Sequence, residues 1–224
     1  MIRFFDILFI VIALIFLSPL LIICIFILKF TGEGEIFYLQ DRIGENQKLF
    51  KIIKFATMLK DSPNLLSKNI TLKNDSRVLP IGKFLRKFKI NELPQLINIL
   101  KGEMSIVGPR PLTPDNYSLY SDYGKNKISK LKPGLSGIGS IFFMSEEDFF
   151  VDSKNHQEVY KKKIIPIKES LEIWYYQNKS VYNYFKVIFL TIFSFFINKK
   201  SRFQILRFFY KDLHKEVKFF NDRL

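Results

Sequence analysis

Glu92 follows Asn91 in a basic stretch of the chain, residues 86–111, which reads RKFKINELPQLINILKGEMSIVGPRP. Arg86 opens this stretch, and Arg110 stands between two prolines near its end. The planar guanidinium of arginine matches phosphate oxygens, whereas a carboxylate suits a divalent cation. The stretch therefore predicts a site for a polyphosphate ligand and a metal. Taken alone, the Gly-Pro-Arg-Pro turn is better explained as a turn with an exposed arginine.

A helix is expected to position this chemistry. Residues 92–100 have helical apolar spacing, with Pro94 in the first turn and Asn91 as the N-cap. Gly102 is placed to end the helix. Because a helix N-terminus attracts phosphate, this helix would present its start to the ligand. Residues 83–88 form a second helix-like run with apolar positions at 81, 84, 85 and 88, for which a solvated basic face is a sufficient explanation.

Two further segments have weaker chemical signals. Gly134 and Gly137 lie in the loop PGLSGIG, where backbone can approach a ligand closely. The loop matches neither phosphate-loop pattern, so by itself it is weak support for a nucleotide. Residues 145–148, Ser-Glu-Glu-Asp, form an acidic patch that could bind metal, although a solvated loop is the simpler interpretation.

Two short extended runs precede the basic stretch. IFYLQDRI and LFKIIKF flank a turn at residues 44–47, which predicts a β-hairpin. Residues 61–74 are polar and loop-like.

The N-terminus is built for lipid. Residues 7–28 are apolar apart from Ser18, and about 22 residues suffice to cross a bilayer. Pro19 lies in the middle, where it removes a backbone donor and favours a kink. A hydroxyl beside it can pair with the freed carbonyl. Two shapes stay open on physical grounds: a kinked single span, or a helix-break-helix that enters and leaves by one face.

The C-terminal part also carries lipid signals. Residues 181–197 are strongly apolar but too short to span, which favours a helix at the membrane interface. Residues 198–224 alternate basic and apolar side chains, which suits a basic amphipathic helix on anionic lipid.

Composition bounds the class of protein. The chain of 224 residues suits one domain plus a membrane element, and its net charge of +14 implies an anionic partner: nucleic acid, anionic lipid or a phosphorylated substrate. Cys24 is the one cysteine and lies in the apolar run, so a disulfide framework is excluded. His156 and His214 lack metal-ligand spacing and are expected at the surface.

Several motifs occur in a fixed order along the chain. They are Ser18-Pro19, Gln40-Asp41-Arg42-Ile43-Gly44, Lys54-Phe55-Ala56-Thr57-Met58, Asp75-Ser76-Arg77, Asn91-Glu92-Leu93-Pro94-Gln95, Lys101-Gly102-Glu103-Met104-Ser105, Val107-Gly108-Pro109-Arg110-Pro111 and Pro133-Gly134-Leu135-Ser136-Gly137. This series resembles the bacterial sugar transferase family, the small monotopic phosphoglycosyl transferases, from about residue 5 to about residue 196.

The resemblance implies an enzyme that moves a sugar-1-phosphate from a nucleotide sugar, usually a UDP-sugar, to polyprenol phosphate and releases UMP. This would be the first membrane step of a surface glycan pathway. In the family, an Asp-Glu dyad with Mg²⁺ does the work: the aspartate attacks the β-phosphate, and the lipid phosphate then displaces it. Expected partners are the nucleotide sugar, polyprenol phosphate, membrane lipids and downstream glycosyltransferases, but no nucleic acid.

The residue patterns and the resemblance together predict an architecture, in which the re-entrant form of the N-terminal helix comes from the resemblance and the tail from its residues alone. The expected fold is mainly α with a small β-hairpin. A re-entrant membrane helix (1–30) comes first. A compact catalytic domain (31–197) follows and ends in an interfacial helix (181–197), and a basic amphipathic tail (198–224) comes last. The protein would be monotopic, at the cytoplasmic face of the bacterial plasma membrane.

Two positions depart from the family pattern. Asn91 stands at the place of the nucleophilic aspartate, and Ala56 stands where arginine is common. An amide is a poor nucleophile and a weaker Mg²⁺ ligand than a carboxylate. Three outcomes stay open. Glu92 takes the nucleophile's role or supports direct displacement; another carboxylate such as Asp75 enters the site; or the protein is a catalytically silent relative that binds nucleotide sugar or recruits glycosyltransferases.

The matched positions imply the remaining roles. Glu92 binds Mg²⁺ or acts as the nucleophile, and Asn91 occupies the nucleophile's place. The implied phosphate ligands are Arg86, Arg110, Lys54 and Arg77; Asp75 is a secondary metal ligand; Gly134 and Gly137 admit the nucleotide; and Ser18 and Pro19 form the membrane break.

Overall fold

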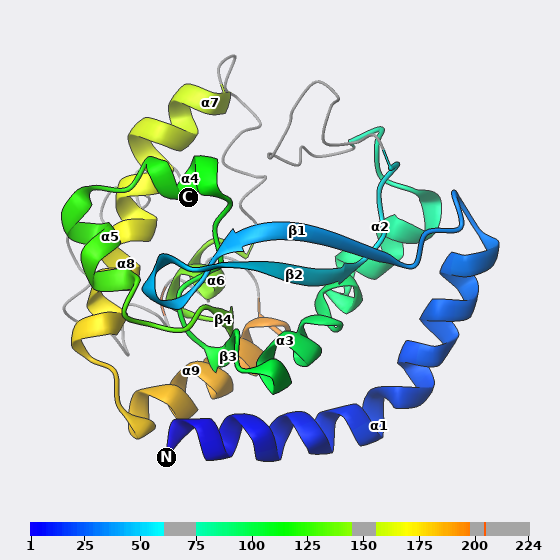
Figure 1. The fold of residues 1–224 in the computed structure, drawn as a ribbon, viewed down its shortest axis with the longest axis horizontal. Coiled ribbons are helices and arrows are strands. Elements are labelled where there is room, and N and C mark those ends of the chain that lie inside the picture. The colour runs from blue at the N-terminus through cyan, green and yellow to red at the C-terminus, as the bar shows by residue number, and fades with distance from the viewer. Residues whose placement is uncertain (61–74, 145–155, 198–203, 205–224) are drawn as a thin grey trace.

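The structure, a computed structural model, describes residues 1–60, 75–144, 156–197 and 204. It confirms a mainly helical fold with a small antiparallel hairpin (Figure 1). The helices are α1 (Ile2–Phe30), α2 (Pro80–Lys87), α3 (Gln95–Lys101), α4 (Pro114–Ser118), α5 (Asp122–Ile128), α6 (Ile138–Phe142), α7 (His156–Val159), α8 (Ile165–Gln177) and α9 (Val181–Ser194). The short turns are η1 (Glu45–Gln47), η3 (Ile90–Glu92) and η5 (Tyr160–Ile164), and the strands are β1 (Phe37–Ile43), β2 (Leu49–Phe55), β3 (Ser105–Val107) and β4 (Gly134–Ser136). The predicted loop 61–74, the acidic patch 145–148 and the predicted tail helix 198–224 lie outside the described residues, Gln204 excepted.

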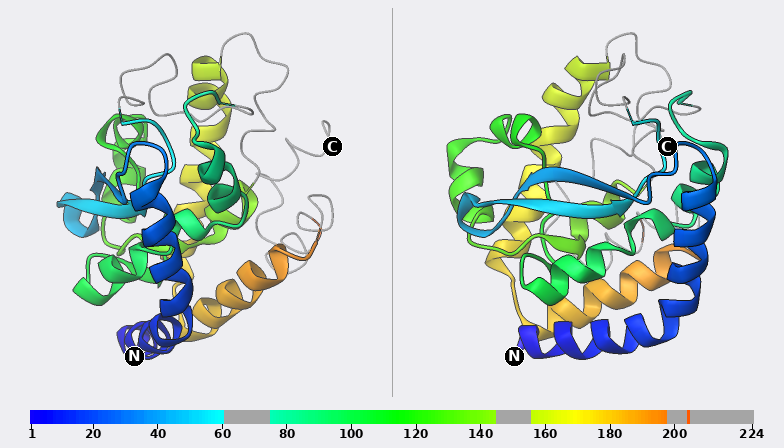
Figure 2. Two further views of the ribbon diagram at one scale, coloured as in Figure 1. Left: turned by 90° about the vertical axis from the view of Figure 1, so that its right-hand side faces the viewer. Right: turned by 45° about the vertical axis from the view of Figure 1, so that its right-hand side comes forward.

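Helix α1 is continuous but bends in its middle (Figures 1 and 2). Pro19 lies inside it and has no N–H for the carbonyl of Ile15, four residues earlier. The hydroxyl of Ser18 donates to that carbonyl at 2.9 Å, as the sequence predicts. The expected break is therefore a bend in an unbroken helix, because the serine replaces the lost hydrogen bond.

Both ends of α1 contact the rest of the protein. Near its start, Arg3 donates to the carbonyls of Ile99 (2.5 Å) and Leu100 (2.9 Å) at the end of α3. Near its end, Cys24 and Leu28 are buried in a cluster with side chains of β2 and α2. The helix is long and apolar enough to cross a membrane, yet its two ends rest on one body.

The hairpin β1–β2 pairs antiparallel with Phe37 opposite Phe55, which confirms the sequence prediction. In this register Arg42 lies opposite Phe50, and Tyr38 lies opposite Lys54. Alternate residues of a strand share a face, so the side chains of Arg42 and Lys54 project on the same side of the hairpin.

The region between α2 and α3 differs from the sequence prediction. Lys89 adopts a left-handed conformation (φ 59°) and starts a separate 3₁₀ turn, η3. Helix α3 begins only at Gln95, with Pro94 at its N-cap and Gly102 ending it at φ 82° as predicted. The prediction that Asn91 caps this helix is therefore wrong; Asn91 lies inside η3 and is buried.

Helix α2 buries less of its apolar stripe than its spacing suggests. Leu85 is buried, but Phe84 and Phe88 are each 53% exposed and lie together with ring centroids 4.9 Å apart. The helix closely approaches the segment that follows β2 at Gly82, where an added Cβ would collide with the carbonyl of Thr57.

Helix α9 starts near the N-terminal end of α1 and diverges from it (Figure 2), and Phe185 packs edge-on against Phe5 and Phe9. Tyr184 and Val187 face the core, whereas apolar side chains cover the outer face. Those exposed at more than half are Tyr182, Phe189, Ile192, Phe195 and Phe196. The helix ends at Ser194, within the predicted range 181–197.

Candidate active site

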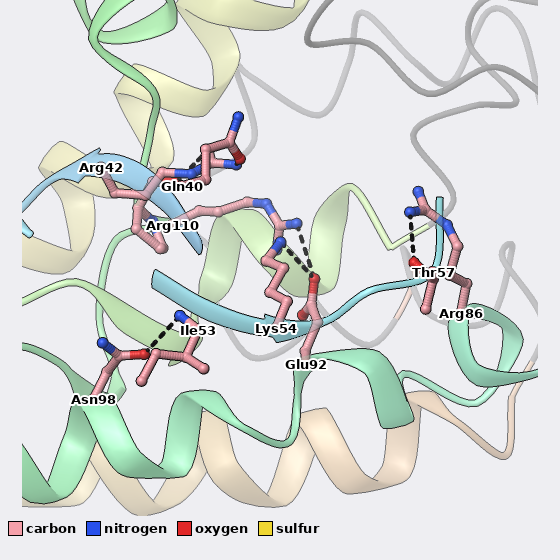
Figure 3. A network of polar contacts seen from close by, with 10 residues as sticks. Gln40, Arg42, Ile53, Lys54, Thr57, Arg86, Glu92, Asn98 and Arg110 are labelled. Atoms are coloured by element: carbon pink, nitrogen blue, oxygen red, sulfur yellow. Dashed lines mark hydrogen bonds and ion pairs between the residues drawn. The ribbon is translucent and has the colours of Figure 1, made fainter. Parts of the chain in front are cut away.

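Three charged side chains from separate elements converge on one carboxylate oxygen (Figure 3). The Oε1 atom of Glu92 lies 3.5 Å from Nζ of Lys54 and 3.4 Å from Nη2 of Arg110. The side chains of Glu92 and Lys54 are only 15% and 17% exposed, whereas that of Arg110 is 42% exposed. The site is thus a largely buried carboxylate between two cations, with one cation open to solvent.

The polypeptide fixes each member of this cluster. Glu92 ends η3, Lys54 lies in β2, and Arg110 follows β3. The fully buried Asn98 joins α3 to β2. Its Oδ1 accepts the N–H of Ile53 at 3.0 Å, and its Nδ2 donates to the carbonyl of Lys51 at 2.8 Å. The backbone beside Lys54 is therefore held at a set distance from α3.

The three charges perturb one another. Burial alone raises the pKa of Glu92, but Lys54 and Arg110 outweigh it and hold that pKa well below its usual range. Burial lowers the pKa of Lys54 to about 8, with a further decrease from the nearby Arg110, while Glu92 opposes the change. The carboxylate is thus ionised at neutral pH, and the lysine titrates within reach of physiological pH.

Arg42 is a member of the site that residue-level analysis did not assign. It donates to the carbonyl of Pro111 at 3.1 Å and to Oε1 of Gln40 at 2.5 Å. Burial, and next the charge of Arg110, lowers the pKa of Arg42 to about 10. The strand pattern could have indicated Arg42. Alternate residues of a strand share a face, and the pairing of the hairpin puts Gln40 and Arg42 on the face that carries Lys54.

The other predicted phosphate ligands lie further from the carboxylate. Arg86 contacts the hydroxyl of Thr57 at 3.5 Å, along β2 from the central cluster (Figure 3). Asp75 and Arg77 form a buried pair, with Nη2 of Arg77 2.6 Å from Oδ2 of Asp75 and Nε 2.9 Å from Oδ1. Both oxygens of Asp75 accept hydrogen bonds from Arg77, so in this arrangement the carboxylate holds the arginine in place. The role of Asp75 as a metal ligand stays a prediction.

The predicted nucleotide-binding glycines lie against protein backbone. Gly134 pairs β4 with β3 in parallel, and a Cβ at Gly134 or Gly137 would collide with the backbone of Gly108. Because Gly134 and Gly137 have no side chain, residues 108–111, the Arg110 turn, can pack directly onto the loop 133–139. Contact with a nucleotide stays a prediction for both residues.

A second buried carboxyl supports the Arg110 turn. Glu172 of α8 is 3% exposed, and its Oε1 accepts the backbone N–H of Arg110 at 3.3 Å. Burial raises the pKa of Glu172 to about 8, against the opposing effect of that N–H. Local pattern does not indicate this contact, because Lys168 and Glu172 have the spacing of an exposed helical ion pair.

The residues present fit a magnesium ion that is bound together with a phosphate ligand. Among the described residues, no group of three or more acidic, histidine or cysteine side chains could hold a metal by itself. Glu92 offers a carboxylate, and the Oδ1 atom of the adjacent Asn91 is buried without a hydrogen-bond partner. Mg²⁺ is commonly held by one or two carboxylates plus substrate phosphates, so this donor set is adequate only with the substrate in place.

One anionic side chain among Lys54, Arg110 and Arg42 leaves a surplus of positive charge, which defines a site for a multiply charged anion. The fold joins this site to an apolar helix of membrane-crossing length. The family model described as bacterial sugar transferase matches residues 1–198, and the chain therefore belongs to this family.

Named relatives agree with this assignment. The chain is 40% identical over 153 residues to the exopolysaccharide production protein ExoY of Sinorhizobium fredii, a match that covers 62% of this chain and 67% of that protein. It is 33% identical over 204 residues to the undecaprenyl-phosphate galactose phosphotransferase of Salmonella typhimurium (84% of this chain, 39% of that protein). It is also 33% identical over 204 residues to the UDP-glucose:undecaprenyl-phosphate glucose-1-phosphate transferase of Klebsiella pneumoniae (89% and 41%). The chain spans about two fifths of the length of the latter two relatives.

Proposed function

We propose that this protein transfers a sugar-1-phosphate from a nucleotide sugar, most simply a UDP-sugar, to polyprenol phosphate in the membrane, with release of UMP. The observation that carries the proposal is the excess of cations around Glu92, which suits a diphosphate, beside a helix suited to lipid. The names of the Salmonella and Klebsiella relatives, which act on undecaprenyl phosphate, support the same acceptor.

Each side chain has a role in this reaction. Arg110, the most exposed member of the cluster, and Lys54 bind the diphosphate oxygens and stabilise the charge that develops on the transferring phosphoryl group. An oxygen of the lipid phosphate forms a bond to the β-phosphorus, and the bond from that phosphorus to the bridging oxygen of UMP breaks. In this direct displacement Glu92 orients the attacking phosphate. In the two-step alternative, a carboxylate oxygen of Glu92 forms the bond to the β-phosphorus and UMP leaves; the lipid phosphate oxygen then bonds to that phosphorus, and the bond to Glu92 breaks.

Magnesium remains part of this proposal. Glu92 and the amide oxygen of Asn91 would hold it together with substrate oxygens, and the bound ion would neutralise phosphate charge. The ion pairs of Lys54 and Arg110 with one oxygen of Glu92, its Oε1, leave the other oxygen available for such contacts.

A re-entrant α1 at the cytoplasmic face of the bacterial plasma membrane accounts best for the contacts of this helix. A straight helix of 29 residues would be about 43 Å long, which separates its ends across a bilayer. Here the bend at Pro19 and the contacts of Arg3 and Leu28 with one body support an entry and exit on the same side. The net charge of +14 favours the anionic cytoplasmic leaflet.

Asn91 favours a second candidate: a catalytically silent membrane-bound relative that binds nucleotide sugar or recruits downstream glycosyltransferases. The buried, unpartnered Oδ1 of Asn91 is a neutral atom where the family carries its nucleophile.

Release of UMP distinguishes the two candidates. The full chain in lipid nanodiscs is supplied with polyprenol phosphate, Mg²⁺ and a panel of UDP-sugars. Transfer predicts UMP from at least one donor, and its loss in Glu92→Gln. If every donor fails with the parent and Asn91→Asp restores turnover, the silent relative is the correct assignment.

A further inference from the structure

We propose that Glu172 is a positioning residue for the phosphate site: its buried carboxyl holds the backbone of Arg110 so that the guanidinium reaches the ligand. This inference rests on the proposed role of Arg110 in binding a diphosphate. The Oε1 atom of Glu172 accepts the N–H of Arg110 at 3.3 Å, and the guanidinium of Arg110 lies 3.4 Å from Glu92. A chain of contacts thus runs from α8 through Arg110 to the central carboxylate.

The position of Glu172 is unusual for a residue with only a packing role. A carboxyl group is costly to bury, and here it is 3% exposed with its Oε2 atom lacking a hydrogen-bond partner. An apolar side chain would fill the same space without that cost. Within the part of the chain that the structure describes, the hydrogen bond that offsets this cost goes to the backbone of Arg110, the proposed phosphate ligand.

The surrounding fold makes room for this carboxyl. A Cβ on Gly139 of α6 would lie 2.6 Å from Oε1 of Glu172, so the glycine leaves space for the oxygen that contacts Arg110. A small pocket beside the turn is lined by Pro109, Arg110 and Glu172. Removal of the carboxyl would leave the turn free to move into this space.

The same helix carries a matched control. Glu169 accepts from the backbone N–H of Ser121 at 3.1 Å and from its hydroxyl, and Gly124 makes room for it as Gly139 does for Glu172. Glu169 therefore fastens α8 to the start of α5 through a carboxyl that accepts a backbone N–H, as that of Glu172 does, but Glu169 is only partly buried and its contacts go to Ser121 rather than to Arg110. A purely structural role predicts the same behaviour for both residues.

The test measures the affinity of the full chain in nanodiscs for inorganic pyrophosphate by titration calorimetry, together with its thermal unfolding midpoint. Glu172→Ala should weaken pyrophosphate binding about tenfold, the effect of one lost hydrogen bond, whereas Glu169→Ala should lower the midpoint alone. Gly139→Ala should mimic Glu172→Ala, and Gly124→Ala should mimic Glu169→Ala. Glu172→Gln retains an acceptor oxygen and should bind like the parent.

A double-mutant cycle identifies the route of the effect. In the Arg110→Ala background, Glu172→Ala should cause no further loss of affinity, because its effect passes through the Arg110 side chain. Equal losses from Glu172→Ala and Glu169→Ala, additive losses in the cycle, or absence of pyrophosphate binding by the parent would overturn the inference. If the parent binds pyrophosphate in this pattern but forms no UMP, the proposed transfer fails and the role of Glu172 stands.

Discussion

Asp6 in α1 and Tyr184 in α9 share a buried hydrogen bond of 2.9 Å across 178 residues of sequence. The same Oδ1 atom of Asp6 accepts the hydroxyl of Ser105 at 3.0 Å and the N–H of Ile106 at 2.9 Å. One carboxylate therefore joins the apolar helices α1 and α9 to β3, the strand that leads to Arg110. This contact links both helices to the segment that carries Arg110.

Loss of that junction should destabilise the protein. Tyr184→Phe removes one donor and should cost about 1–3 kcal/mol, because hydrogen bonds to charged groups are the stronger ones. Asp6→Ala should cost more, since three buried donors lose their acceptor. Thermal unfolding in nanodiscs measures both changes. Tyr182→Phe, on the exposed face of α9, is the control and should leave the midpoint unchanged.

Diphosphate affinity should fall as pH rises through about 8, because burial lowers the pKa of Lys54 to about 8 and the ammonium is lost above it. Pyrophosphate titrations in EDTA, at a series of pH values, measure this. Lys54→Arg keeps its charge throughout, so the ratio of parent to variant affinity cancels the protonation of pyrophosphate itself. A ratio that stays constant from pH 6 to about pH 9 would refute the role of the lysine charge. Lys51→Met, on an exposed part of the same strand, should retain the parent profile.

Part of this arrangement follows from local sequence rules. The hairpin, the Ser18 hydroxyl that replaces the bond lost at Pro19, and the end of α3 at Gly102 each depend on near neighbours, and each is confirmed. The N-cap prediction for Asn91 failed because the left-handed Lys89 starts a separate turn, which spacing does not indicate.

The site itself depends on contacts between distant segments. Lys54 and Arg110 meet Glu92 across 38 and 18 residues. Residue types in the basic stretch placed Glu92 and Arg110 in one predicted site, whereas only the family motifs added Lys54 to it. The contact from Glu172 to Arg110 was beyond sequence reasoning, because a buried and an exposed helical glutamate have the same local pattern. Burial of this kind is decided by how α8 packs on the Arg110 turn.

The topology of α1 can be tested with single cysteines in a Cys24→Ser background. Phe4→Cys and Phe30→Cys, both at exposed ends of α1, should react with a membrane-impermeant thiol reagent only from the cytoplasmic side. Phe16→Cys, near the bend, should be protected from both sides because lipid surrounds it. Reaction of Phe4→Cys from the external side would establish a spanning helix instead.

Magnesium affinity should respond to Asn91. Asn91→Asp adds a second carboxylate beside Glu92 and should strengthen Mg²⁺ binding at least several-fold in the presence of pyrophosphate. Calorimetry with the full chain measures this. Gln177→Glu adds the same charge at an exposed position at the end of α8 and serves as the control. Equal Mg²⁺ affinity in parent and Asn91→Asp would show that position 91 does not face the metal.

The mass of the lipid product tests the central claim most directly. The full chain in nanodiscs is incubated with polyprenol phosphate and the UDP-sugars of the panel, and the lipids are analysed by mass spectrometry. Transfer of a sugar-1-phosphate predicts a polyprenol diphosphate sugar, formed with UMP and absent with Glu92→Gln. A polyprenol monophosphate sugar, formed with UDP, or an unchanged product with Glu92→Gln, would contradict the account.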